Sequence, residues 1–161
     1  MTVYDSREQR FGRYFDEFEA GDVYRHWPGH TITEAEDHLF CSLTMASSPL
    51  HIDAHYATTE MDGGRNIVVG TFVYALLLGM SVPDTSGKAI AALGTEQLRH
   101  VAPLYHGDTL YGETTVIATR PSRSRPTAGI VTIETRGFKQ DQSTVCEFRR
   151  SFLAPTRASR R

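Results

Sequence analysis

The sequence predicts an α+β protein in which a single antiparallel sheet wraps around a long buried central helix. Residues 70–80 are apolar nearly all round, with three consecutive leucines at 76–78, which is typical of a buried helix in a soluble chain. Beyond Pro83 lie four runs rich in β-branched and aromatic residues, separated by turn residues: 89–103, 107–120, 127–139 and 143–154. One sheet around one helix is the simplest layered arrangement of these parts.

The first third of the chain predicts a short strand and then a capped helix. Residues 23–26 have a strand-like composition, and the Trp-Pro-Gly segment 27–29 is expected to end that strand. Thr33 and Glu36 form a capping-box pair, in which each side chain satisfies an exposed N–H group of the other residue. We therefore expect a helix over 34–45. The side chains that it would direct toward the core are Ala35, Leu39, Phe40 and Leu43.

Composition and charge exclude several classes of partner. The 161 residues carry a formal net charge of −2, so the chain lacks the basic surface that nucleic acid requires. Cys41 and Cys146 have no CxxC spacing and predict free thiols in a reducing compartment. The apolar stretch 67–82 is short for a membrane span, and residues 1–8 are charged where a signal peptide would be apolar. We expect a cytoplasmic protein without a membrane partner.

The chain is expected to form one domain over 1–161. It has no internal repeat and no low-complexity linker, and its length suffices for one sizeable core, over about 11–154. The short basic C-terminal tail is expected to be solvated. A sheet edge and leftover exposed apolar groups favour pairing with a second copy, so we expect a homodimer or a higher homo-oligomer.

The segment 44–53, TMASSPLHID, holds the strongest candidate for a functional residue. His51 comes two residues after Pro49, on a turn between two predicted helices. Proline fixes φ and removes a backbone donor, so it holds this turn and orients the histidine after it. Histidine titrates near neutral pH, which makes His51 a candidate general acid/base. The histidines assigned to surface or packing positions are His26, His30, His38, His55 and His100.

Three motifs, in order along the chain, carry a resemblance to a known family. They are 15–22 (FDEFEAGD) with 31–35 (TITEA), 49–53 (PLHID) with Tyr56-Ala57, and 101–110 (VAPLYHGDTL). Over roughly residues 11–154 the sequence resembles the MaoC-like dehydratases, the (R)-specific enoyl-thioester hydratases of the hot-dog fold. The resemblance implies a hot-dog domain and a reaction that adds water to, or removes it from, an acyl thioester.

The family's hydration site resembles the pattern Asp-x-Asn-Pro-x-His, in which the Asp and the His act together on water. A base must take a proton from water, and the α-carbon must receive one. On this chain the histidine position is His51, the proline position is Pro49 and the Asn position is Ser48. The acidic position is Ala46, which carries no acid/base group.

The resemblance also implies where the thioester is held. A helix start presents unpaired N–H groups and a partial positive charge, so Gly70 and Thr71 are candidates for binding the thioester oxygen. Ser48, as a second catalytic candidate, and Ser47 are suited to hold a water or a substrate carbonyl, or they are plain turn residues. Asp53 is interpreted as a helix N-cap. No metal-ligand spacing and no Gly-rich phosphate loop occur, so no metal or cofactor is expected.

Three functions stay open at this point. The first is a hydratase or dehydratase acting on a CoA-bound or carrier-bound acyl thioester, with His51 as general acid/base. The second is a hot-dog thioesterase, for which Asp53 or Glu60 would supply a carboxylate. The third is a thioester-binding or scaffold protein without catalysis, for which Ala46 is the chief argument. The sequence does not define the acyl group.

Overall fold

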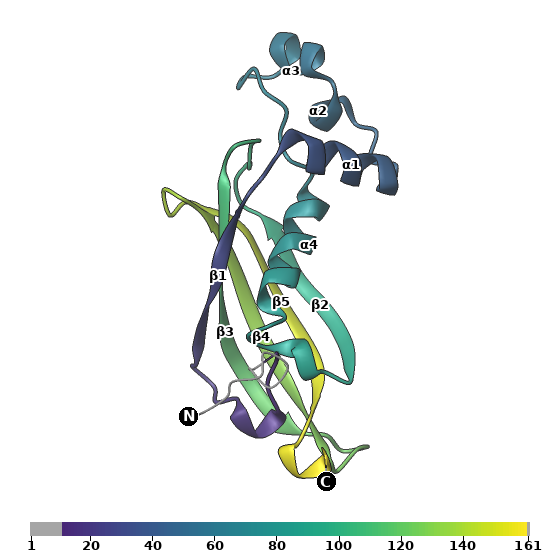
Figure 1. Ribbon diagram of the computed structural model, residues 1–161, viewed down its shortest axis with the longest axis vertical. Helices are drawn as coiled ribbons and strands as arrows, with labels where there is room; N and C mark the ends of the chain where they lie inside the picture. Colours follow the sequence, from purple (N-terminus) through teal and green to yellow (C-terminus); the bar gives the residue numbers. More distant parts are fainter. Residues whose placement is uncertain (1–10, 161) are drawn as a thin grey trace, which may run out of the picture.

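The computed structural model describes residues 11–160 and contains a five-stranded antiparallel sheet. The strand order is β1-β3-β4-β5-β2. The strands are β1 (Val23–Thr31), β2 (Ala91–His100), β3 (Thr109–Pro121), β4 (Ala128–Lys139) and β5 (Thr144–Pro155). The helix α4 (Gly70–Ser81) runs along one face of this sheet (Figure 1). The predicted α+β arrangement of sheet and central helix is therefore confirmed.

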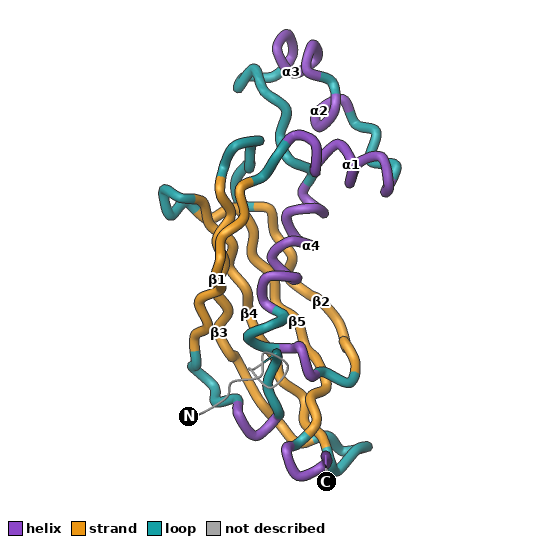
Figure 2. Tube along the Cα trace, in the orientation of Figure 1, coloured by secondary structure: helices purple, strands orange, loops and turns teal. Residues whose placement is uncertain are grey.

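The other helices gather beyond one end of the sheet, next to the N-terminal end of α4 (Figure 2). They are α1 (Glu34–Thr44), α2 (Pro49–Ile52) and α3 (Ala54–Glu60). Short 3₁₀ turns lie at η1 (Phe15–Glu17), η2 (Ser86–Lys88) and η3 (Arg157–Arg160). Within 11–160, no helix has the length and hydropathy that a membrane crossing needs. The prediction made for residues 1–8 lies outside the described residues.

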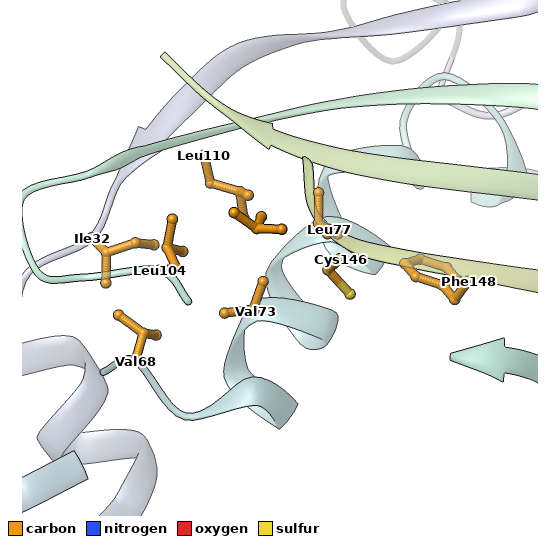
Figure 3. Close-up of a cluster of buried hydrophobic side chains, with 9 residues drawn as sticks. Ile32, Val68, Val73, Leu77, Leu104, Leu110, Cys146 and Phe148 are labelled. Atoms are coloured by element: carbon orange, nitrogen blue, oxygen red, sulfur yellow. The ribbon is translucent and has the colours of Figure 1, made fainter. Parts of the chain in front are cut away.

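A cluster of buried apolar side chains joins α4 to the sheet (Figure 3). Its members are Ile32, Val68, Val73, Leu77, Leu104, Leu110, Val145, Cys146 and Phe148. The helix contributes Val73 and Leu77, whereas Thr71 and Ala75 on its other side are exposed. Gly137 on β4 lets the helix approach closely, because a Cβ atom there would lie 2.3 Å from Leu77 Cδ1. In the single chain the helix is thus buried along one face.

Two capping predictions are confirmed. The Thr33 side chain accepts a hydrogen bond from the Glu36 N–H, and the Glu36 carboxylate accepts one from the Thr33 N–H at the start of α1. At the start of α3, Asp53 Oδ1 accepts a hydrogen bond from the Tyr56 N–H at 2.9 Å. Each cap involves residues only three positions apart, so the local sequence suffices to specify it.

The predicted end of the first strand is wrong. β1 continues through the Trp-Pro-Gly segment to Thr31, with a shift of register between His26 and His30. Among the described strands β1 lies at the edge of the sheet and pairs with β3 alone, so Pro28 does not interrupt a ladder on its other side.

The predicted core face of α1 is wrong for three of its four residues. Ala35 is exposed, and Leu39 and Leu43 are 60% and 76% exposed, while the buried residues of the helix are Asp37 and Cys41. Of the predicted core residues, Phe40 is half-buried, and its ring stacks on Phe72 of α4 with the centroids 5.0 Å apart. Asp37 makes a polar contact with the residue before α4.

Candidate functional site

His51 lies on the short helix α2, which begins at Pro49 after the N-cap residue Ser48. Its Nδ1 atom is 2.8 Å from the carbonyl oxygen of Ile67. A carbonyl oxygen can only accept, so Nδ1 carries the hydrogen and donates. In the neutral ring Nε2 therefore holds the lone pair. The half-buried His51 is thus held in the tautomer that can take up a proton at Nε2.

Asn66 fixes the turn that carries His51. Its side-chain Nδ2 lies 3.1, 3.0 and 3.2 Å from the carbonyl oxygens of Pro49, Leu50 and Asp53, respectively. The next residue, Ile67, donates its N–H to Leu50 O at 3.2 Å. Asn66 is only 7% exposed, so these bonds are shielded from competing water. Sequence reasoning missed this residue, because nothing local distinguishes it from a loop asparagine.

One cavity of about 390 Å³ brings His51 together with the start of α4. Its lining is His51, Ile67, Val68, Gly70, Val73, His100, Val101, Ala102, Pro103, Leu104 and Val145. Two of the predicted site residues, His51 and Gly70, therefore meet here. Ser47, Ser48 and Thr71 are outside this lining, although Thr71 directly follows Gly70 in the chain. The wall is otherwise apolar, and its two titratable side chains are His51 and His100.

The N-terminus of α4 forms one wall of this cavity. The N–H groups of Phe72 and Val73 both donate to Val69 O, at 2.9 and 3.3 Å. The amides of Gly70 and Thr71 precede them, at the positions of a helix that have no intrahelical acceptor. Together with the helix dipole, these amides favour a negatively charged oxygen.

The ring of His100, the last residue of β2, packs directly on Gly70. A Cβ atom built on Gly70 would lie 2.8 Å from both Cε1 and Nε2 of His100. Any larger residue at position 70 would displace this ring. The close approach of the His100 ring explains why position 70 is a glycine. The sequence analysis had assigned His100 to a surface or packing position.

A buried carboxylate positions the residue just before α4. Asp37 is 0% exposed, and its Oδ1 accepts the Val69 N–H at 3.1 Å. Its Oδ2 lies 2.9 Å from Nε2 of His106. Both oxygens of the buried acid are therefore engaged, as the burial of a charge demands.

The acidic position of the hydration pattern holds a methyl group. Ala46 comes after Met45, which adopts a left-handed conformation with φ 57° at the end of α1. The Ala46 N–H donates to Cys41 O at 2.9 Å. The two carboxylates considered for a thioesterase, Asp53 and Glu60, do not line the cavity, and Asp53 caps α3. Within 11–160, no group of three or more His, Cys, Asp or Glu side chains is placed to hold a metal ion.

The sequence model of the mesaconyl-CoA hydratase family matches residues 2–161. The chain belongs to this family. A mesaconyl-CoA hydratase from Haloarcula marismortui is 32% identical to this family member over 154 residues, which are 95% of this chain and 42% of that protein. A solved MaoC domain protein dehydratase from Chloroflexus aurantiacus gives a TM-score of 0.85 at 28% identity, over 93% of this chain and 42% of that chain.

The fold class is confirmed by a third protein. A Mycobacterium tuberculosis protein described as having a double hotdog fold gives a TM-score of 0.71 at 24% identity, over 90% of this family member and 44% of that chain. The present chain spans about two fifths of the length of the curated relatives that it matches. Those relatives are thus long enough to hold two such units.

Proposed function

We propose that this member of the mesaconyl-CoA hydratase family adds water to an enoyl thioester, or removes it from a 3-hydroxyacyl thioester. His51 would be the general acid/base. One observation carries the proposal: a histidine held with Nε2 free to accept a proton shares a cavity with the open N-terminus of α4. The chemistry needs a base and an oxyanion site, and it needs no cofactor.

The proposed hydration begins at the β-carbon of the substrate. The oxygen of water bonds to that carbon while His51 Nε2 takes a proton from the water. The double-bond electrons move toward the thioester oxygen, which the amides of Gly70 and Thr71 stabilise. Ser47 and Ser48 lie outside the lining of the cavity, so they are assigned no role in this step. The cycle ends when the α-carbon gains a proton, and dehydration takes the same steps in reverse.

We infer a CoA thioester with a short, branched or carboxylated acyl group as the substrate class. Support comes from the names of the relatives, a mesaconyl-CoA hydratase and a β-methylmalyl-CoA dehydratase. A thioesterase is less well supported, because neither Asp53 nor Glu60 lines the cavity that holds His51.

We also propose that two copies of the chain pair along β2. All ten residues of this edge strand are exposed in the single chain, among them Leu93 and Leu98. Exposed apolar strand edges are sites for pairing. The relatives have room for two units in one chain, and a second copy would replace the second unit. Light scattering should give at least twice the 18.0 kDa of one chain.

The proposed activity is tested by mixing the purified protein with mesaconyl-CoA or crotonyl-CoA and measuring the loss of the conjugated absorbance. Release of free CoA thiol, measured in parallel, would instead identify hydrolysis. A third outcome, neither reaction but a rise in Tm with acyl-CoA, would mean that the protein binds thioesters without catalysis, as Ala46 suggested.

A further inference from the structure

The missing acid at position 46 leaves the proposed reaction with one proton-transfer group where it needs two. His51 can take the proton from water, but the α-carbon must also receive a proton. We propose that His100 supplies that proton and is the second catalytic residue of the site. This inference rests on the proposed function, because it concerns the same hydration.

The position of His100 is the first argument. Its ring packs on Gly70, the first residue of α4, where the thioester oxygen is proposed to bind. The α-carbon is one bond from the carbonyl carbon. A group in contact with Gly70 is therefore placed near the α-carbon, and His51 lines the same cavity.

The second argument is that His100 is available. Within 11–160, neither ring nitrogen of His100 is hydrogen-bonded to the protein, and the residue lines the cavity. The backbone holds it, because the β2–β5 register places His100 opposite Cys146 at the end of a long paired strand. An imidazole whose ring nitrogens have no protein partner can form a hydrogen bond with a substrate in the cavity.

The other acids and histidines near the site are already engaged. Both oxygens of Asp37 are occupied, by Val69 N–H and by His106. Asp53 caps α3 through Tyr56 N–H. Among the residues that line the cavity, His100 is the titratable side chain that remains beside His51.

The proposed step is balanced in atoms and charge. The water oxygen forms a bond to the β-carbon, and His51 gains the water proton. The electron pair of the double bond passes through the enolate to the α-carbon, which takes a proton from the His100 imidazolium. His100 is left neutral and His51 protonated. Exchange with solvent then returns both rings to their starting states, and no oxidant, reductant or other co-reactant is required.

The experiment compares His100→Gln and His100→Ala with wild type on mesaconyl-CoA and crotonyl-CoA. His55→Gln is the matched control, because His55 is an exposed histidine on α3 outside the cavity. We expect kcat to fall about 10²- to 10³-fold in both His100 variants, with KM within about threefold of wild type. Free imidazole should restore part of the activity of His100→Ala, and the control should match wild type. Thermal melts establish that each variant is folded.

Three results would overturn the inference. If His100→Gln keeps the wild-type kcat, or raises KM alone, His100 is not the proton donor, while the proposed hydratase function stands. If imidazole does not rescue a folded His100→Ala, the loss of activity is structural. If wild type itself hydrates neither thioester, the proposed function fails and this inference fails with it.

Discussion

Asp37 and Val69 are joined by a hydrogen bond of 3.1 Å between the Asp37 carboxylate and the Val69 N–H, although they lie 32 positions apart in the chain. The carboxylate is fully buried, and Val69 is the residue directly before α4. This bond therefore fixes the helix start at which the thioester oxygen is proposed to bind. It also explains why α1 turns Asp37 inward and leaves its leucines exposed.

Replacing Asp37 by Asn should weaken this arrangement. The amide can still accept from the Val69 N–H, but it cannot match the charge-assisted bond to His106. We expect a loss of about 1–3 kcal/mol in the free energy of unfolding and a kcat lower by about tenfold, since a misplaced helix start misplaces the oxyanion site. Denaturant unfolding and steady-state hydration check both. Asp62→Asn, at an exposed position, is the control, and equal effects at both sites would refute the role of Asp37.

Asn66 offers a sharper comparison, because its side chain donates to three carbonyl oxygens. Asn66→Ala removes the donor and should cost about 1–3 kcal/mol of stability. Asn66→Asp should cost more, since a carboxylate would face three acceptors and could donate to none of them. Both should lower kcat by loosening the His51 turn. Urea unfolding ranks the three proteins by their free energy of unfolding. An Asn66→Asp protein as stable as wild type would contradict the role of Asn66 in holding the α2 turn.

The capping box of α1 predicts a pH dependence of stability. Hydrogen bonds from the Thr33 side chain and N–H lower the pKa of Glu36 below its ordinary value of 4.5. The unfolded state therefore binds the proton more readily, so the stabilisation is present above pH 4.5 and disappears as the pH falls through the lower folded pKa. Tm measured against pH should show wild type more stable than Glu36→Gln at pH 7, by at most about 1 kcal/mol for so exposed a group.

That difference should vanish in strong acid, where both side chains are neutral. Glu60→Gln provides the control, because Glu60 is exposed and its side chain makes no hydrogen bond or ion pair within 11–160. A Glu36→Gln deficit that stays constant from pH 7 to strong acid would show that the carboxylate charge plays no part.

Local features of the sequence were sufficient for much of the fold. The Thr33–Glu36 and Asp53 caps involve neighbours in the chain. The four strand runs are rich in β-branched and aromatic residues and are separated by turn residues, which is typical of strands. The core face of α1 was not predictable in this way, because it depends on a contact between Asp37 and a residue far along the chain. Leu39 and Leu43 are exposed, whereas Phe40 of the same predicted face stacks on Phe72.

The candidate site likewise contains residues that the local sequence identifies and residues that it does not. His51 stands out because a proline precedes it within a recognisable motif, and Gly70 because it begins an apolar helix. Asn66 and His100 belong to no motif, and each gains its place only when distant segments meet: Asn66 under the α2 turn and His100 on Gly70. Contacts between residues far apart in the sequence depend on strand register and on how the helices pack, so the local sequence does not reveal them.

The decisive test of the proposed mechanism is the rate at which His51→Gln hydrates an enoyl-CoA, compared with wild type and with the His55→Gln control. Glutamine can keep a hydrogen bond to Ile67 O but cannot act as a base, so the change removes the chemistry with little effect on the fold. We predict a fall in kcat/KM of about 10²- to 10⁴-fold with an unchanged Tm. A folded His51→Gln protein that hydrates at the wild-type rate would contradict the assignment of His51 as the general acid/base.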